Sequence, residues 1–390
     1  MALLKNSLIV AGGTLASRSV ALIRDILLAK VIGAGLVMDA LIVALRAPNI
    51  IRQLLAEGAL NVTAIPFLSK HMPNQQPTPA AERFSASVLS LLVVLLVALC
   101  ALGMWAMPVV VTLIAPGFHA TDPARFDLAV WLSRLTFPYT FFIVIVSFYG
   151  AILNALGRFI AFAIAPLFLN ISFIIFLTIA AGKPAPENYA AIAFTVGGVL
   201  QLAWMVYMLK RAKFSLRWQK PHLHPETPAL LGRLGPASLS IGVQLVNGLI
   251  DGIFASWLAA GAVSYLFYAD RLYYLPVSLL GIAVSSVLLP ELSRRLHAHE
   301  TARAAATFTT AMNTVFALGL ASALGLLCLA PYIMELIYQR GAFGVEATRA
   351  TAYCLMAYAM GLPAVVASKL TMTVMYAQGD TKTCLLYTSD

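Results

Sequence analysis

The sequence has little charge and little cysteine. Only 11% of its 390 residues are Asp, Glu, Lys or Arg, whereas 61% are hydrophobic and the mean hydropathy is +0.86. Soluble domains carry about 25% charged residues, so this composition excludes an ordinary soluble protein, a disordered chain and a nucleic-acid-binding protein. Four cysteines without a C-x-x-C pair, and six histidines confined to connecting segments, indicate neither a disulfide framework nor a zinc site.

Motifs for catalysis and for nucleotide hydrolysis are also missing. The chain has no G-x-x-x-x-G-K-[ST] sequence and no soluble segment large enough for an ATPase, and its loops have no paired acids or nucleophile elbow. We therefore predict a protein that is not an enzyme, and a polytopic glycosyltransferase is disfavoured. Transport by such a chain would be driven by an ion gradient, the membrane potential or the gradient of its substrate.

What the sequence does have is a series of long apolar runs. Stretches of about 18 or more apolar residues recur along its whole length, which predicts an all-α polytopic membrane protein. The predicted spans are 6–32, 36–68, 84–114, 127–155, 159–181, 189–210, 229–259, 263–290, 304–337 and 347–377.

The connecting segments differ in their content of Lys and Arg. With the N-terminus inside, thirteen of these residues fall in cytoplasmic segments and four on the far side. Cytoplasmic loops of membrane proteins are enriched in Lys and Arg, so the asymmetry predicts a cytoplasmic N-terminus. The four residues predicted on the far side are Arg125, Lys183, Arg340 and Arg349.

A weak internal repeat divides the chain. Residues 24–35 align with 250–261 at a shift of 226, and IPFLSK at 65–70 resembles LPELSR at 289–294. Six spans separate the copies, so both halves have the same orientation, and a substrate site is expected between two parallel bundles. The predicted division is a first bundle over 1–210, a basic cytoplasmic linker over 211–228, an incomplete second bundle over 229–382 and a non-native tail over 383–390.

Nine cations fall inside the predicted spans, together with five acids. The cations are Arg18, Arg24, Lys30, Arg46, Arg52, Arg134, Arg233, Arg271 and Lys369, and the acids are Asp25, Asp39, Glu57, Asp251 and Asp270. Charges within a bilayer are costly and usually face a wet cavity. Lys30, Arg134 and Arg233 can be explained by helix ends from which the side chain reaches the interface. Pairing cannot neutralise the remainder, because cations exceed acids.

Arginine in excess predicts an anionic cargo, because its planar guanidinium stays charged and binds phosphate oxygens bidentately. Arginines of spans 1, 2 and 8 around one cavity would suit a phosphate or pyrophosphate headgroup, with Glu57 orienting an arginine or contacting sugar hydroxyls. Asp25 is interpreted as a structural ion-pair partner. Asp251 has no adjacent arginine in sequence, and it is equally a candidate ligand for Na⁺ or H⁺ and a packing acid.

The motifs resemble those of the MurJ (MviN) family of lipid II flippases, within the superfamily of multidrug, oligosaccharidyl-lipid and polysaccharide exporters. The resemblance extends to about residue 382 and rests on Arg24-Asp25, Gly33-Ala34-Gly35, Asp39-Ala40, Pro48-Asn49-x-x-Arg52-x-x-x-Ala56-Glu57-Gly58-Ala59, Tyr268-Ala269-Asp270-Arg271-Leu272, Pro276 and Leu288-Leu289-Pro290-x-Leu292-Ser293. It implies two bundles around a central cationic cavity. The implied function is moving lipid-linked peptidoglycan precursor between the leaflets of the bacterial cytoplasmic membrane by alternating access.

The resemblance also implies which residues bind the substrate. Arg18, Arg24, Asp39, Arg52 and Arg271 match cavity charges of the family, Glu57 lies in its A-E-G-A motif, and Lys369 matches a basic residue of its later helices. The implied partners are lipid II, membrane lipids and the cell-wall synthesis machinery, and no cofactor is expected beyond a coupling Na⁺ or H⁺.

The family has about fourteen spans, so the resemblance implies a chain truncated at its C-terminus. Three alternatives remain open at this point. The chain could export another oligosaccharide-lipid, act as a cation-coupled drug exporter, or bind lipid II as a membrane scaffold without moving it.

Overall fold

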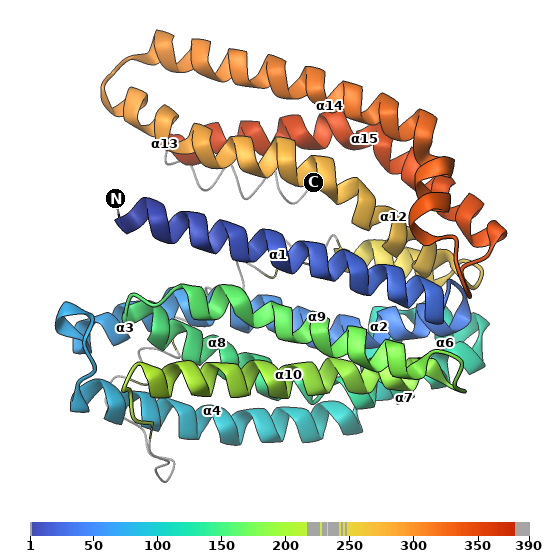
Figure 1. Ribbon diagram of the computed structural model, residues 1–390, viewed down its shortest axis with the longest axis horizontal. Helices are drawn as coiled ribbons and strands as arrows, with labels where there is room; N and C mark the ends of the chain where they lie inside the picture. Colours follow the sequence, from blue (N-terminus) through green and yellow to red (C-terminus); the bar gives the residue numbers. More distant parts are fainter. Residues whose placement is uncertain are drawn as a thin grey trace. The chain divides into compact units, whose positions relative to one another are not determined.

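A computed structural model describes residues 2–216 and 248–378, together with positions 227, 232, 242 and 245. Side chains are described from Ser17 onward, except at 56–59, 61, 62, 282 and 283. The chain separates into two compact units, Met1–Ala260 and Gly261–Asp390 (Figure 1). Residues 248–256 are helical and belong to the first unit. This unit extends to Ala260, which is 31 residues beyond the predicted start of the second bundle at 229.

The first unit is a bundle of long helices joined by short connections (Figure 1). Its elements are α1 (Ala2–Val31), α2 (Leu36–Ile51), the π-helix η1 (Arg52–Ala59), α3 (Leu60–His71), the 3₁₀ turn η2 (Pro73–Gln75), α4 (Pro79–Trp105), α5 (Met107–Ile114), α6 (Pro116–Thr121), α7 (Pro123–Thr136), α8 (Tyr139–Ala155), α9 (Ile160–Ala180) and α10 (Pro186–Arg211).

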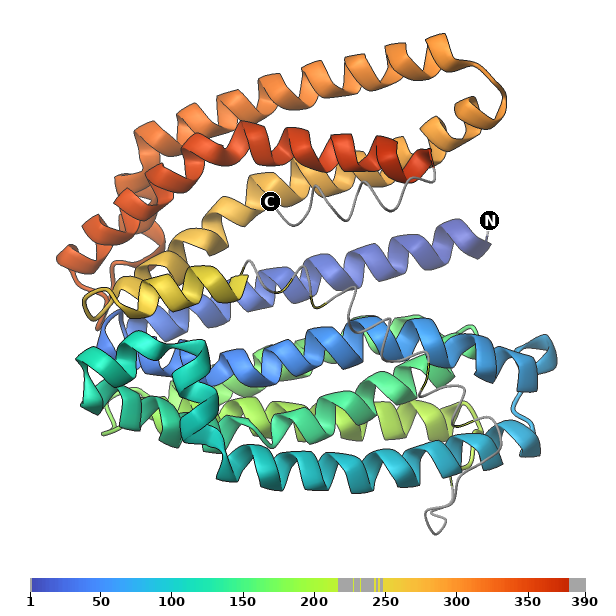
Figure 2. The same cartoon turned by 180° about the vertical axis from the view of Figure 1, so that it is seen from behind.

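The second unit is formed by three long helical segments. They are α12 (Ala262–Pro276) continued by the π-helix η3 (Val277–Ile282) and α13 (Ala283–His297), then α14 (Thr301–Tyr338) and α15 (Val345–Ala377). Figure 2 shows α14 and α15 lying side by side. At one end Tyr268, Tyr338 and Phe343 form a buried aromatic cluster with ring centroids 4.9–5.9 Å apart.

The helices follow the predicted spans closely. Seven helical segments of the described chain are long and apolar enough to cross a membrane, and they coincide with spans 3–6 and 8–10. Spans 1 and 2 are also helical, in α1 and in α2 through α3, and they carry most of the intramembrane charges. Span 7 is described mainly from residue 248. Span 3 is interrupted, because α4 stops at Trp105 and the separate helix α5 starts at Met107 with Pro108 in its first turn.

Proline inside a helix requires compensation, because its ring removes one backbone donor and leaves the carbonyl four residues earlier without its partner. Pro48 lies in α2, so the carbonyl of Ala44 loses its helical hydrogen bond. The buried hydroxyl of Thr136 on α7 donates to that carbonyl at 2.9 Å. The kinked part of α2 is therefore held against α7.

The predicted repeat is visible in the order of the elements. In the first half Gly35 starts α2, a proline precedes η1, and Pro66 lies inside α3. In the second half Gly261 starts α12, Pro276 precedes η3, and Pro290 lies inside α13. Single π-helical turns are rare and occur frequently at functional sites, so their occurrence at corresponding places supports a common ancestry of the two halves.

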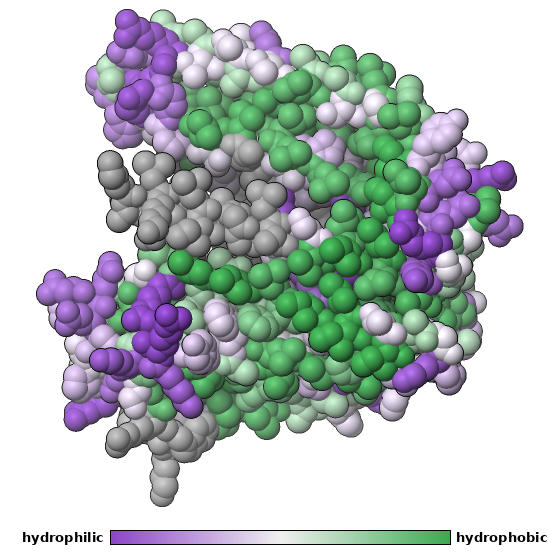
Figure 3. Space-filling model, viewed as in Figure 1, coloured by the Kyte–Doolittle hydropathy of each residue, from purple (hydrophilic) through white to green (hydrophobic). Residues whose placement is uncertain are grey.

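The surface of the first unit is apolar along the middle of its helices. Figure 3 shows hydrophobic surface over these helices and hydrophilic groups gathered at their ends. Exposed large hydrophobic residues recur along α4 and α9, including Val94, Leu95, Leu102, Ile171 and Ile175. Exposed apolar surface of this extent is expected to face lipid.

Candidate functional site

The charged residues of α1 form a network with α9. Arg24 donates from Nε and Nη2 to Oδ1 of Asp25 at 2.9 and 2.7 Å, and from Nη1 to Oδ1 of Asn170 at 2.9 Å. Asn170 in turn donates to the carbonyl of Ser17 at 3.3 Å. The Asp25 side chain is only 3% exposed and that of Arg24 16%. The carboxylate of Asp25 thus neutralises Arg24, and Asn170 fixes its guanidinium against α9. The guanidinium carbon lies 5.5 Å from the ring centroid of Phe173 on the same helix.

Arg46 of α2 approaches the segment that begins the second half of the repeat. Its guanidinium packs on the backbone of Gly252, where any side chain would overlap it. Asp251 interacts with it electrostatically, and its buried Nη1 makes no hydrogen bond within the described residues. The acid that lacked an adjacent arginine in sequence therefore has one in space. The described residues contain no group of three or more potential metal ligands.

Arg52 is the first residue of the π-helix η1 and is half-buried. Its Nε donates to Oδ1 of Asn49 at 3.1 Å, so the Pro48-Asn49-x-x-Arg52 motif fixes the start of its side chain locally. Glu57 lies in the same π-helix, and its side chain is outside the described set. Arg18 on α1 is exposed.

In the second unit, Arg271 of α12 is exposed and its guanidinium lies 4.7 Å from the ring centroid of Phe267. Lys369 of α15 is half-buried and packs near Gly281 of η3. The hydroxyl of Ser285 donates to the carbonyl of Lys369 at 3.3 Å. Arg271 thus lies on α12, which the π-helix η3 continues, and Lys369 lies on α15, which packs against both.

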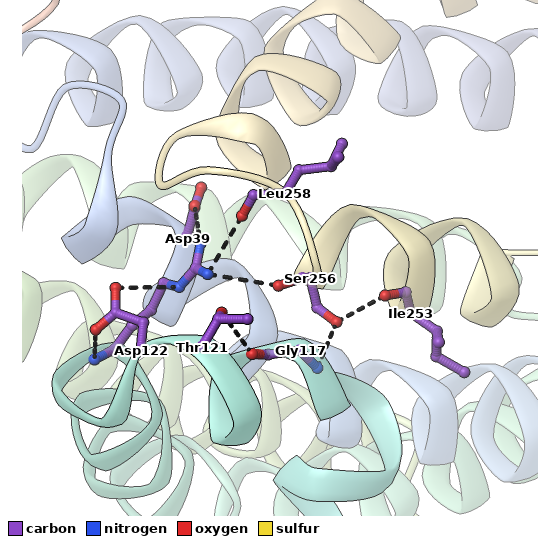
Figure 4. Close-up of polar contacts among 8 residues, drawn as sticks. Asp39, Gly117, Thr121, Asp122, Ile253, Ser256 and Leu258 are labelled. Carbon is purple, nitrogen blue, oxygen red and sulfur yellow. Dashed lines mark hydrogen bonds and ion pairs between the residues drawn. The ribbon is translucent and has the colours of Figure 1, made fainter.

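A fully buried arginine at the far end of the first unit joins three segments. Arg125 is 1% exposed, and its guanidinium lies 3.3 Å from Asp39 and 3.6 Å from Asp122. It also donates to the carbonyls of Ser256 and Leu258 at 3.4 Å each, and Figure 4 shows these groups converging. The ring of Phe118 stacks 4.1 Å from its guanidinium carbon.

The backbone beside this arginine packs unusually closely. The amide of Gly117 donates to the hydroxyl of Ser256 at 3.0 Å, and that hydroxyl donates to the carbonyl of Ile253 at 2.6 Å (Figure 4). A side chain at position 117 would overlap the backbone of Ser256 and Trp257. This cluster, the Arg125 cluster, ties α2, α6 and α7 to residues 253–258.

The sequence-based interpretation of Arg125 as a loop cation on the far side is wrong. Asp122 caps α7 by accepting from the amide of Arg125 at 3.1 Å, and Pro123 occupies the first helical turn. The helix therefore begins before residue 127, which puts Arg125 inside the fold. Asp-Pro before an apolar run is a helix start signal, so the position was recognisable, but its pairing with Asp39 was not.

Two features now define the class of protein: long membrane-crossing helices in two related halves, and arginines buried within them. A solved multidrug resistance MATE family transporter of the MOP superfamily, in its inward-facing conformation, aligns with a TM-score of 0.71 at 15% identity, covering 96% of this chain and 83% of that one. The chain thus has the fold of this transporter superfamily.

The family follows from the sequence comparisons. The family model described as "Lipid II flippase MurJ" matches residues 28–389, and the chain belongs to this family. "Probable lipid II flippase MurJ" of Rickettsia prowazekii is 34% identical over 100% of this chain and 76% of its own length, and that of Rhizobium meliloti is 36% identical over 99% and 73%. A solved "Lipid II flippase MurJ, inward closed conformation" aligns with a TM-score of 0.83 at 25% identity, covering 98% of this chain and 78% of that one.

Proposed function

We propose that this chain moves lipid II, the lipid-linked peptidoglycan precursor, from the inner to the outer leaflet of the bacterial inner membrane. The observation that carries the proposal is the excess of arginine within the membrane-crossing helices of a chain of the MurJ family. The chain is a transporter and not an enzyme. Family membership favours lipid II over the other oligosaccharide-lipids and over cationic drugs.

The pyrophosphate of the substrate is proposed to bind Arg18, Arg24, Arg52 and Arg271, with Lys369 adding positive charge. Arg24 supports this role because its partners, Asp25 and Asn170, hold its guanidinium in place while leaving it 16% exposed. Preorganised arginines bind phosphate with little loss of side-chain entropy. Glu57 is proposed to orient an arginine or to contact the sugar hydroxyls.

Asp39 is proposed to act on transport through the fold. Its carboxylate is fully buried and pairs with Arg125 at 3.3 Å. A carboxylate held in this way stabilises the first turns of α2, and thereby the orientation of the helix that leads to Arg52. Contact between Asp39 and an anionic headgroup would in addition be electrostatically unfavourable.

The N-terminus is proposed to lie in the cytoplasm. With Arg125 buried inside the fold, three loop cations remain on the far side against thirteen on the proposed cytoplasmic side. The membrane potential would then act on the charged substrate during each cycle. The two halves of the repeat are proposed to form the two bundles whose relative motion opens the cavity alternately to each side.

Coupling to Na⁺ or H⁺ is also a proposal, with Asp251 as the candidate ligand. Asp251 interacts electrostatically with the guanidinium of Arg46, which favours a charge partner over a cation site there. Transport measured with and without Na⁺ separates the two roles. The proteins that make and consume lipid II are proposed as partners, because the substrate must pass from one to the other.

The test is complementation of a bacterium depleted of its own lipid II exporter. Arg52→Ala and Arg271→Ala should each fail to restore growth while the protein still inserts in the membrane. Arg134→Ala is the matched control, because Arg134 also lies in a span but is not a proposed ligand, and within the described residues it hydrogen-bonds the carbonyl of Met104. Full rescue by both Arg52→Ala and Arg271→Ala would refute the assignment.

A second assay separates a flippase from a scaffold that binds lipid II without moving it. The purified chain is reconstituted in liposomes that carry lipid II, and exchange between the leaflets is followed by an enzyme that modifies only the outer pool. A flippase accelerates the modification of the inner pool, whereas a scaffold leaves that pool protected.

A further inference from the structure

A basic cavity in the first unit is lined by none of the residues proposed to bind the substrate. It measures about 560 Å³ and opens to the surface between the end of α8, the start of α9 and the end of α10. Its lining consists of Gly157, Arg158, Phe159, Ile160, Ala161, Ile164, Trp204, Met208 and Arg211. This volume falls in the range of small-molecule sites, and the lining contains two arginines and no acid.

The position of Arg158 is set by the backbone. Gly157 adopts a left-handed conformation with φ of +72°, its amide donates to the carbonyl of Asn154, and the amide of Arg158 donates to the carbonyl of Leu153 at 2.8 Å. This pattern ends α8 in the manner of a glycine-capped helix. The turn therefore presents Arg158 at a defined place on the rim of the cavity.

The opposite wall is fixed by two hydrogen bonds between α9 and α10. The indole of Trp204 donates to the carbonyl of Ala161 at 2.9 Å, and the amide of Gln201 donates to the carbonyl of Ala165 at 3.1 Å. Arg211 follows two turns after Trp204 at the end of α10. The wall of the cavity opposite the α8–α9 turn is thus fixed by helix packing.

No anionic side chain of the described residues neutralises the two arginines. Within the described residues, neither the guanidinium of Arg158 nor that of Arg211 forms a hydrogen bond or an ion pair, and both side chains are exposed. By contrast, Arg294, Arg295 and Arg303 around a second basic cavity are all paired with Glu291 or Glu300. A cavity with two uncompensated guanidinium groups favours an anion.

Apolar and aromatic groups beside the arginines indicate the kind of anion. Phe159 is 47% exposed, Tyr207 is 54% exposed, and the ring of Trp204 lies 5.9 Å from that of Tyr207. Trp and Tyr at the ends of membrane-crossing helices lie at the level of the lipid headgroups. Lys210 and Lys213 lie at the end of α10 but do not line the cavity. The phosphate of a phospholipid would contact the two arginines, and the first methylenes of its acyl chains would contact Phe159 and Trp204.

We infer that this cavity binds the phosphate headgroup of an anionic membrane phospholipid, with Arg158 and Arg211 as its ligands. The lipid would dock at the junction of α8, α9 and α10 and would be distinct from the transported substrate. Because the cavity lies within one compact unit, its occupation would not require the two halves of the protein to move.

The test is lipid binding to the purified full chain in detergent, measured by native mass spectrometry during titration with phosphatidylglycerol. A hydrogen bond from a charged donor contributes roughly tenfold or more in affinity, so R158Q/R211Q should bind at least about tenfold more weakly. The matched control is R83Q/K210Q, which removes two exposed cations from the same end of the unit but outside the cavity. The control should bind within about threefold of the unaltered chain.

Two further probes separate the sources of phosphate. Zwitterionic phosphatidylcholine should bind weakly and equally to all variants, and inorganic phosphate at the same concentration should not displace phosphatidylglycerol. The inference fails if R83Q/K210Q weakens binding as much as R158Q/R211Q does, since the effect would then be general surface charge. It also fails if inorganic phosphate displaces the lipid or if phosphatidylcholine binds equally well. Thermal melting in detergent checks that each variant is folded, and transport activity is not needed for any arm.

Discussion

Replacing Arg125 by Met is expected to be among the most destabilising single changes in the first unit. The substitution keeps an unbranched apolar stem but removes the guanidinium, so the fully buried carboxylate of Asp39 loses its ion pair with Arg125 and two backbone carbonyls lose a donor. Breaking a buried ion pair by removing one partner costs about 3–5 kcal/mol. The contacts of 3.3–3.6 Å are longer than ideal, so we expect the lower half of this range.

The assay is thermal melting of the purified protein in detergent, where about 3 kcal/mol corresponds to a fall of roughly 6 °C or more at about 2 °C per kcal/mol. Arg125→Met combined with Asp39→Asn should recover at least half of the loss, because the stranded charge is gone. Lys183→Met removes an exposed cation from the same end and should change the melting temperature by about 1 °C or less. If Arg125→Met melts within 1 °C of Lys183→Met, the cluster does not stabilise the fold as argued.

Three further changes test other contacts. Gly117→Ala should destabilise the protein by about 1–3 kcal/mol, because the new methyl overlaps a neighbouring backbone, whereas Gly325→Ala has open space and should be neutral or slightly stabilising in the same melting assay. Thr136→Val should cost about 1–3 kcal/mol, because it strands the carbonyl released by the proline of α2, whereas Thr178→Val loses only a bond to its own exposed helix turn and should cost less than 1 kcal/mol. Asn170→Leu should lower lipid II export several-fold at unchanged protein level, because Arg24 loses the hydrogen bond that fixes its guanidinium against α9; export equal to that of the unaltered chain would show that the contact is dispensable.

The helical architecture could be predicted from composition and the lengths of apolar runs. Nine of the ten predicted spans coincide with helices of the described chain, and the remaining one, 229–259, is described mainly from residue 248. Apolar length is a strong signal because a bilayer leaves no alternative partner for backbone donors and acceptors. Helix breaks were less visible, as the early end of α4 shows, because a proline near a span end is compatible with either a kink or a stop.

The motif residues were recognisable because they recur at short spacing. The bond between Arg52 and Asn49 joins residues three positions apart, which helix geometry brings together. Arg24 pairs with the residue that follows it in the sequence. The π-helical turns after the prolines had no sequence signal of their own. They are recognised only once the backbone hydrogen bonds are known.

Ion-pair partners on different helices could not be predicted from the spacing of residues in the sequence. Asp39 and Arg46 are seven apart on one helix, yet Asp39 pairs with Arg125, 86 residues away, and Arg46 lies against Gly252 beside Asp251. The number of membrane charges and the excess of arginine follow from the sequence, because the low dielectric of the membrane makes each such charge significant wherever it lies. Which carboxylate neutralises which arginine depends on how kinked helices pack, and hence on contacts that no local pattern encodes. The packing of the helices therefore decides which arginines form ion pairs that stabilise the fold and which can bind an anionic lipid.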